Sequence, residues 1–247
     1  MLNFSPQANS LKNKIILVTG AGDGIGRAAS LSYASFGATV ILLGRTVKKL
    51  EKLYDEIVEK GYPEPAIVPL DLKGATKKHY QDMASTIQNQ FGRLDGVLHN
   101  ASILGHLEPF HQISEDMYDE VMQVNVKSQF LMTQALLDVL QLAPNGSVVF
   151  TSSSVGNKGR AFWGSYSISK FATEGMMQVL ADEYANSSLR FNCINPGGTR
   201  TTMRAKAFPG EDPKTLKTPE QIMPLYLYLM SDDSSDKTGN TFVAQPK

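Results

Sequence analysis

The stretch KIILVTGAGDGIGRAA, residues 14–29, decides the fold of this chain. An apolar run over 14–20 has the length of a buried strand, and it leads into a turn with glycines at every second position from 20 to 26. The order of strand, glycine-rich turn and helix is typical of the first unit of a parallel α/β sheet.

Further short apolar runs alternate with helical patterns along the rest of the chain. These runs lie at 38–44, 66–72, 94–100, 146–152 and 189–195, and a weaker run at 241–244 follows them. In 115–140 the apolar residues Met117, Val121, Val124, Leu131 and Ala135 fall on one helical stripe. Such alternation with short links predicts an α/β fold: one Rossmann-like, doubly wound parallel sheet of about seven strands, with helices on both faces.

The pattern assigns residues 1–247 to a single domain. Ser114 indicates a helix start, and Gly37, Gly61 and Gly92 stand where helices are expected to stop. We expect residues 1–12 to form a loose N-terminal arm. The segment at about 195–217 is rich in glycine, proline and threonine, and we expect it to be a mobile substrate loop over the site.

Composition excludes several functional classes. The 24 basic and 24 acidic residues give a net charge of +0, which argues against nucleic-acid or anionic-membrane partners. No apolar stretch reaches the length of a membrane span, so a cytoplasmic location is expected. Cys193 is the one cysteine and is expected to be buried packing. His106 and His111 lie close in sequence with no further ligands nearby, so we expect no metal site.

The glycine-rich turn predicts a dinucleotide site. Glycines let the backbone approach a pyrophosphate, and a helix N-terminus from about Ile25 presents free N–H groups to it. The alternative is a tight strand-to-helix turn without a ligand. The candidate phosphate-binding residues are Gly20, Gly22, Asp23, Gly24, Ile25 and Gly26.

The end of the second strand favours NADP(H), with NAD(H) still possible. An acidic residue about 20 positions after the glycines would bind the ribose of NAD. Here Arg45 lies 19 positions after Gly26, and a guanidinium pairs with a 2′-phosphate. Lys48 and Lys49 either add charge there or form a solvated helix face. Asp71, followed by Leu72, either reaches the adenine amino group or caps the next element.

The stretch GSYSISKFATEG, residues 164–175, places Tyr166 four positions before Lys170. On a helix the two side chains share one face. An ammonium at that position favours the phenolate form and lowers the tyrosine pKa. The pair predicts a tyrosine that exchanges a proton near neutral pH.

Taken together, these motifs resemble those of the short-chain dehydrogenase/reductase family. TGAGDGIG (19–26) is similar to its TGxxxGIG, SYSISK (165–170) to its YxxxK, and NPGGTRTTM (195–203) to its PGxxxTxM. HNA (99–101), Asn125 and a spacing of 13 residues from Ser153 to Tyr166 also match. The spacings indicate the one-domain branch. The strings DGVLHNA, MQVNV and VFTSSSVG resemble more narrowly the YciK-type bacterial oxidoreductases.

The resemblance implies roles for four catalytic residues. Ser153 would hydrogen-bond and polarise a substrate carbonyl. Tyr166 would give that oxygen a proton during reduction or take one from an alcohol during oxidation. Lys170 would lower the pKa of Tyr166 and hold the nicotinamide ribose. Asn125 would hold a water that relays protons to Lys170.

The resemblance also implies the rest of the cofactor site and the reaction. Asn100 and Ala101 would line the central part of the cofactor, and Thr201 would contact the nicotinamide carboxamide. Below the ring would lie Ile194, Pro196 and Gly197, with Thr199 in the same segment. The implied reaction is a reversible, NADP(H)-dependent hydride transfer between nicotinamide and a small carbonyl or alcohol. Family members often pair subunits through the helices that hold Asn125 and Tyr166, which implies a homodimer or homotetramer.

Two departures from the family pattern concern the cofactor site. Ser102 replaces the glycine usual after Asn-Ala. Asp23 stands where many NADP-using members carry a basic residue.

Two questions stay open at the level of sequence. Near Tyr166 and in the expected loop lie Arg160, Phe162, Trp163, Met203, Arg204 and Phe208. They form either an apolar pocket with a basic rim, suited to a bulky carbonyl, or loop packing with solvated arginines. The alternative to an enzyme is a catalytically quiet NADP(H)-binding sensor or regulatory protein, which would have no use for Tyr166.

Overall fold

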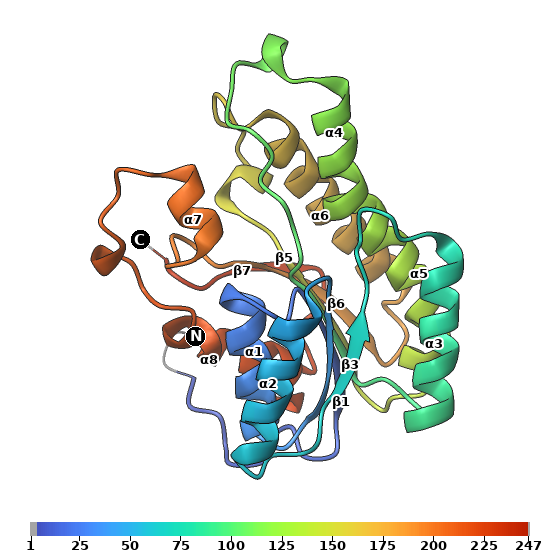
Figure 1. The fold of residues 1–247 in the computed structure, drawn as a ribbon. Coiled ribbons are helices and arrows are strands. Elements are labelled where there is room, and N and C mark those ends of the chain that lie inside the picture. The colour runs from blue at the N-terminus through green and yellow to red at the C-terminus, as the bar shows by residue number, and fades with distance from the viewer. Residues whose placement is uncertain (1–3, 247) are drawn as a thin grey trace.

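All of the expected strands are present and pair in parallel. The computed structural model describes residues 4–246, and its seven strands lie in the order β3-β2-β1-β4-β5-β6-β7 (Figure 1). The strands are β1 (Ile15–Thr19), β2 (Thr39–Gly44), β3 (Ala66–Pro69), β4 (Gly96–His99), β5 (Gly146–Thr151), β6 (Leu189–Asn195) and β7 (Asn240–Val243). The predicted fold class, a single Rossmann-like domain around a parallel sheet, is confirmed.

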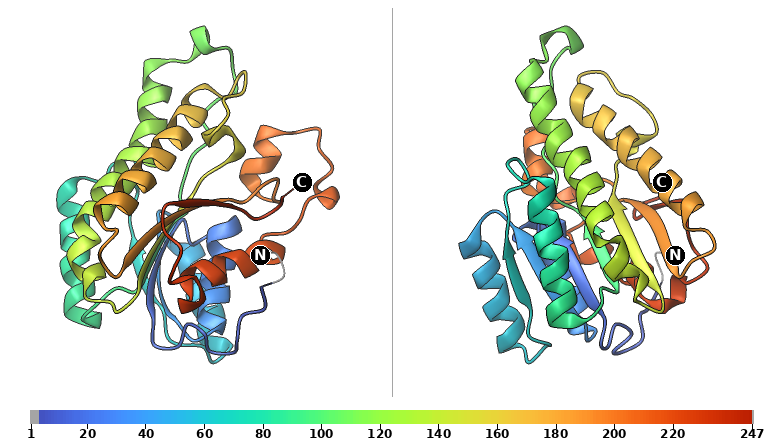
Figure 2. Two further views of the ribbon diagram at one scale, coloured as in Figure 1. Left: turned by 180° about the vertical axis from the view of Figure 1, so that it is seen from behind. Right: turned by 90° about the vertical axis from the view of Figure 1, so that its right-hand side faces the viewer.

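Helices cover both faces of the sheet (Figure 2). One layer contains α1 (Gly24–Ser35), α2 (Val47–Glu59) and α8 (Met223–Met230). The other contains α3 (Lys77–Phe91), α4 (Glu115–Met122), α5 (Ser128–Gln141) and α6 (Gly164–Glu183). Successive β1 residues alternate between the layers, because side chains of a strand point to opposite faces. Ile16 and Val18 pack in the first core and Leu17 in the second, and all three are fully buried.

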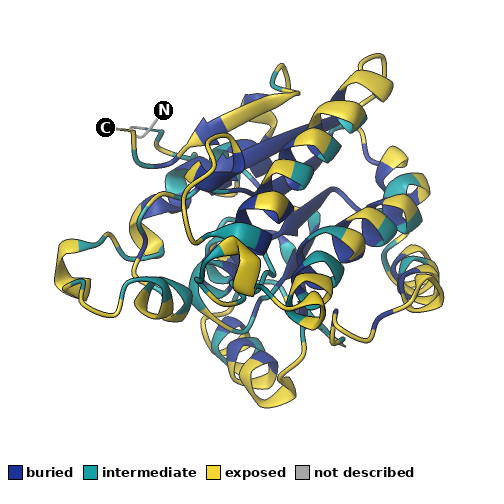
Figure 3. Ribbon diagram, turned by 90° about the horizontal axis from the view of Figure 1, so that it is seen from above, coloured by how far each residue is buried: buried dark blue, intermediate teal, exposed yellow. Residues whose placement is uncertain are grey.

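Each large helix has a buried side and an exposed side (Figure 3). Inner helix surfaces are buried against the sheet, while the outer surfaces are exposed. Cys193 on β6 is fully buried, as expected for a packing residue, and burial raises the pKa of its thiol. No helix within residues 4–246 combines the length and apolar character needed to cross a bilayer. In the same range, no three histidine, cysteine or acidic side chains come together as a possible metal site.

The predicted helical stripe over 115–140 is interrupted by a wider turn. Ser114 caps α4 by accepting a hydrogen bond from the Met117 N–H, as the sequence indicated. A π-helical turn over Gln123–Lys127 then separates α4 from α5. The Ser128 hydroxyl donates to the Val124 carbonyl at 2.6 Å, which gives a partner to a group that a wide turn leaves exposed. Apolar periodicity predicted the helix, but it carries no signal for the extra residue.

The two segments expected to be loose are packed against the body. Of the expected N-terminal arm, residues 1–3 lie outside the described residues. Leu11 is fully buried, and the Phe4 ring lies 5.1 Å from that of Tyr228. The segment 195–217 contains a short helix, α7 (Thr202–Ala207), and a parallel bridge between Thr199 and Lys217 closes it. The segment 195–217 therefore contains regular structure of its own, and its mobility and its contact with substrate stay predictions.

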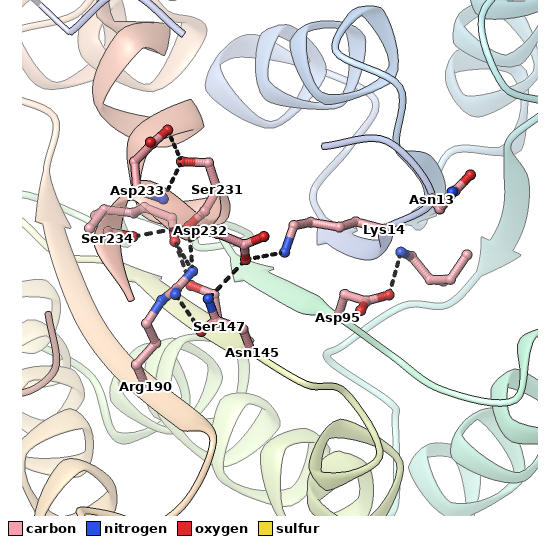
Figure 4. Close-up of polar contacts among 12 residues, drawn as sticks. Asn13, Lys14, Asp95, Asn145, Ser147, Arg190, Ser231, Asp232, Asp233 and Ser234 are labelled. Carbon is pink, nitrogen blue, oxygen red and sulfur yellow. Dashed lines mark hydrogen bonds and ion pairs between the residues drawn. The ribbon is translucent and has the colours of Figure 1, made fainter. Parts of the chain in front are cut away.

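The amino-terminal edge of the sheet is held by a buried arginine (Figure 4). Arg190 on β6 is 2% exposed and donates to the carbonyls of Leu229 (3.1 Å) and Ser231 (2.8 Å) at the end of α8. It also donates to the Asn145 side chain at 2.7 Å. Asn145 in turn donates to Asp232, which pairs with Lys14 at 2.7 Å. A cation at a helix C-terminus satisfies carbonyls that have no helical partner. The network ties α8 to β1 and β6 on the side opposite the glycine turn.

Candidate functional site

The glycine-rich turn leaves no room for side chains. Gly20 has φ +68, a conformation that favours glycine, and it ends β1. A Cβ on Gly26 would lie 2.2 Å from the Gly20 carbonyl oxygen and 2.7 Å from Asn100 Nδ2. Helix α1 begins at Gly24, with Asp23 as its N-cap. The turn therefore brings bare backbone and a helix N-terminus to the carboxyl edge of the sheet, as a dinucleotide phosphate requires.

Two cations near the turn are Arg45, which follows β2, and Lys49 on α2. Arg45 directly follows β2 and is exposed, and no carboxylate within residues 4–246 forms an ion pair with it. Lys49 forms an ion pair with Asp23 at 2.6 Å. The Lys49 ammonium lowers the pKa of the Asp23 carboxyl. Asp23 thus draws a cation to the turn, although it is itself acidic where many relatives of NADP-using type are basic.

Asp71 is exposed and forms a local turn beyond β3. Its Oδ1 accepts from the Lys73 N–H at 3.1 Å. It does not cap the next helix, because α3 has Thr76 as its N-cap. The capping alternative therefore holds for this turn but not for α3, and the adenine contact stays a prediction. Leu72 beside it is buried.

The ends of β1 and β4 are joined through Thr19. Its Oγ1 accepts from the backbone N–H groups of Asn100 (2.9 Å) and Ala101 (3.0 Å). The same hydroxyl donates to the Leu98 carbonyl at 3.3 Å. The two residues expected to line the middle of the cofactor are thereby fixed beside the glycine turn.

The segment after β6 is held by the C-terminal segment. Gly197 has φ +71, and Thr199 is buried. The Gln245 amide donates to the carbonyl of Pro196 at 2.8 Å and to the Thr199 hydroxyl at 3.2 Å. Gln245 therefore ties the C-terminal segment to the cofactor-side loop, a contact that no sequence signal indicated.

Helix α7 reaches back over the glycine turn. Its N-cap is Thr201, whose Oγ1 accepts from the Arg204 N–H at 3.1 Å. A Cβ on Gly24 would lie 3.3 Å from the Thr201 methyl group. The structure thus brings the predicted residues of the first and last cofactor motifs together.

Ser153, Tyr166 and Lys170 converge at the carboxyl end of β5. Ser153 caps a short 3-10 turn after β5, and its hydroxyl acts to lower the pKa of Tyr166. Lys170 is 1% exposed, and its Nζ donates to the Thr151 carbonyl at 2.7 Å. The same Nζ lies 5.4 Å from the centre of the Tyr166 ring. Gly156 lets α6 lie close to this strand end, because a Cβ on Gly156 would lie 3.0 Å from Lys170 Cβ.

Burial dominates the electrostatics of this pair. It raises the pKa of Tyr166 to about 12, against the opposite effect of Ser153 and Ser102. It lowers the pKa of Lys170 to about 8, although Cys193 and Glu174 act in the other direction. Burial is the largest effect on Tyr166 here, and the expectation that Lys170, together with a bound oxidised nicotinamide, brings the tyrosine pKa toward neutrality stays a prediction. Tyr166 is a protonated phenol at neutral pH, the form that donates a proton.

Asn125 lies in the π-helical turn and is fully buried. Its side-chain oxygen accepts from the Ile103 N–H at 2.8 Å, and its amide donates to the Ile103 carbonyl at 2.9 Å. The amide also donates to Ser169 at 3.0 Å, one residue before Lys170. Both amide hydrogens are used by protein atoms, so the side chain links the segment after β4 to α6. The proposed water relay is an additional role that stays a prediction.

Sequence reasoning missed two residues that face the catalytic pair. Ser102 interacts with the Tyr166 hydroxyl, and the only signal was its departure from the family glycine. Glu174 is 7% exposed, lies one turn beyond Lys170 on α6, and accepts a hydrogen bond from Thr241. Its spacing of four from Lys170 was visible in the sequence and places it on the same helix face.

The buried ammonium predicts a pH-dependent stability. The folded-state pKa of Lys170, about 8, lies below the ordinary 10.5, so the unfolded chain binds more protons between these values. The free energy of unfolding contributed by this group therefore rises with pH in that window. We expect wild-type protein to gain about 2 kcal/mol over Lys170→Met between roughly pH 8 and 9.5. Urea unfolding at a series of pH values measures the difference.

The matched control is Lys78→Met, because Lys78 forms an exposed helical pair with Asp82. Its difference from wild type should stay constant over the same range. A constant difference for Lys170→Met as well would contradict a buried, titrating Lys170.

Comparison with known proteins agrees with this geometry. The chain is 57% identical over 245 residues to the oxidoreductase YciK of Escherichia coli (strain K12), covering 99% of this chain and 97% of that protein. A crystal structure of a short chain dehydrogenase from Shigella flexneri 2a str. 301, complexed with NADP, superposes with a TM-score of 0.95 at 57% identity. It covers 97% of this chain and 100% of that one.

A second crystal structure, from Escherichia coli CFT073, is complexed with NADPH. It matches with a TM-score of 0.95 at 58% identity, over 98% of this chain and 100% of that chain. The sequence profile of the short chain dehydrogenase family matches residues 14–212, the span from β1 through the segment after β6. The glycine turn, the Ser153–Tyr166–Lys170 cluster and these matches agree, and the chain belongs to the short-chain dehydrogenase/reductase family of oxidoreductases.

Proposed function

We propose that this oxidoreductase uses NADP(H) to interconvert a carbonyl and an alcohol, with Tyr166 as the general acid/base. The observation that carries the proposal is the convergence of Ser153, Tyr166 and Lys170 beside the glycine turn. A sensor that only binds a nucleotide has no need of a buried lysine at a tyrosine ring, since burying an ammonium is costly.

The residues present fit a phosphorylated dinucleotide. A Cβ on Gly26 would meet the Gly20 carbonyl oxygen, so the turn and α1 pack closely, and the backbone N–H groups at the start of α1 would hold a pyrophosphate. Arg45 is exposed at the end of β2, where a 2′-phosphate would be read. Relatives at 57–58% identity have been crystallised with NADP and NADPH, which supports the preference. Asn100, Ala101, Pro196 and Gly197 would hold the middle and the nicotinamide end.

The protein would position the substrate and polarise its carbonyl group, and the nicotinamide would supply or accept the hydride. Ser153 donates a hydrogen bond to the substrate oxygen and favours its developing negative charge. Tyr166, protonated at neutral pH, gives that oxygen a proton in the reductive direction. The Lys170 Nζ lies 5.4 Å from the centre of the Tyr166 ring. It would return a proton to Tyr166 or hold the ribose.

We also propose that the chain forms a homodimer or homotetramer through α5 and α6. These helices carry exposed apolar side chains: Phe130 (51%), Ile168 (37%), Phe171 (45%) and Val179 (56%). Large exposed apolar residues gathered on neighbouring helices mark association surfaces. Light scattering at micromolar concentration should give a dimer or tetramer mass, and Phe171→Lys should lower it. A monomeric wild-type protein would contradict the proposal.

Tyr166→Phe tests the chemistry directly. The variant lacks the proton donor but keeps the ring, so turnover of carbonyl compounds with NADPH should fall at least 100-fold, as for loss of a general acid. Binding of NADPH, measured by its fluorescence, should be retained. Tyr118→Phe, which alters an exposed tyrosine on α4, is the control and should keep full activity. Normal turnover by Tyr166→Phe would remove this residue as the acid.

Arg45→Asp tests the cofactor preference. The carboxylate repels a 2′-phosphate and hydrogen-bonds a ribose hydroxyl, so the ratio of kcat/KM for NADPH to that for NADH should fall at least tenfold. Lys52→Asp makes the same charge change at another exposed position on α2 and should leave the ratio nearly unchanged. An unaltered ratio in Arg45→Asp would show that the 2′-phosphate is read elsewhere.

A further inference from the structure

A pair of aromatic rings extends the site outward from Tyr166. The Trp163 ring, just before α6, lies 5.8 Å from the Tyr166 ring. The Phe208 ring, just after α7, lies 5.8 Å from Trp163 on the other side. Both Trp163 and Phe208 are half-buried. Two segments far apart in sequence therefore build one apolar surface that ends at the catalytic tyrosine.

Two arginine guanidiniums lie near these rings, and only one of them has a carboxylate partner. The Arg204 guanidinium lies 3.7 Å from the centre of the Phe208 ring. It also forms a two-pronged ion pair with Glu211, with both distances 2.6 Å. Arg204 therefore holds α7 to its following loop and has its charge compensated.

Arg160 has no such partner. Its guanidinium lies 6.0 Å from the centre of the Trp163 ring and 5.7 Å from that of Phe208. The residue is exposed, and within residues 4–246 its side chain forms neither an ion pair nor a hydrogen bond. Contact with aromatic rings holds a guanidinium in place while its N–H donors stay available. Arg160 is thus a cation without a carboxylate partner, and it lies beside the apolar surface of Trp163 and Phe208.

We infer that Arg160 binds an oxyanion of the substrate, so that the substrate is a carbonyl compound with a flat apolar body and a carboxylate or phosphate group. The inference rests on the proposed function for the end of the substrate that meets Tyr166. The apolar body lies along Trp163 and Phe208, and the oxyanion meets Arg160 at the far end. A guanidinium pairs with either oxyanion through two parallel hydrogen bonds.

The chain supplies its own probe for this test, because Trp163 is its one tryptophan. Its fluorescence is titrated with 4-formylbenzoate, 4-formylphenyl phosphate and the uncharged methyl 4-formylbenzoate. We expect the two anions to quench at concentrations about tenfold below those of the ester, and the stronger anion identifies the preferred group. Arg160→Met should weaken anion binding about tenfold and leave the ester response unchanged. Lys158→Met removes a neighbouring exposed cation and should behave as wild type.

Equal quenching by the ester and both anions would overturn the inference, as would wild-type anion affinity in Arg160→Met. The binding result is independent of turnover. Tyr166→Phe should keep the preference for the anions while it loses catalysis. If Tyr166→Phe kept full turnover, the proposed chemistry would fail, and the role of Arg160 would still be decided by the titration.

Discussion

Burial of a parallel sheet on both faces is the constraint from which the site follows. Parallel strands need crossover connections, and right-handed crossovers bring every strand back in the same direction. All seven carboxyl ends therefore lie along one edge, and the winding reverses between β1 and β4. At this reversal the adjacent connections diverge to opposite faces and leave a crevice. Thr19 fixes the floor of that crevice by bonding both strand ends, so the glycine turn and Asn100 face the same space.

The parts that the sequence predicted are those governed by local patterns. Continuous apolar runs predicted each strand, and close backbone approach explains why Gly26 accepts no Cβ. The parts it did not predict depend on contacts between distant segments. The π-helical turn at Asn125 exists with Ile103 and Ser169 as partners, which no periodicity reveals. Helix α7 likewise depends on the bridge between Thr199 and Lys217 that closes its segment, because a six-residue helix has little intrinsic stability.

Residue spacing alone leaves out the effect of burial on the Tyr166–Lys170 pair. Four residues of separation place an ammonium near a phenol, and in water that proximity favours the phenolate. Inside the fold both groups lose their hydration, which favours the neutral form of each. The pKa of Tyr166 rises to about 12 and that of Lys170 falls to about 8. The resting tyrosine is consequently a proton donor. In the oxidative direction Tyr166 would have to accept a proton. The lower pKa of Tyr166 that this requires would have to come from charges of the bound cofactor or substrate.

Family membership and substrate choice reside in different parts of this molecule. The parallel sheet belongs to the family fold, and a fold by itself does not define the compound that is converted. The proposed substrate contacts lie in the segments after β5 and β6, where two arginines lie near the same Phe208 ring with different partners. Arg204 is compensated by Glu211 and acts in packing, whereas Arg160 keeps its charge. The sequence offered pocket and packing as alternatives for this group of residues. The structure pairs Arg204 with Glu211, which favours packing for that arginine, and the pocket alternative stays a prediction for Arg160.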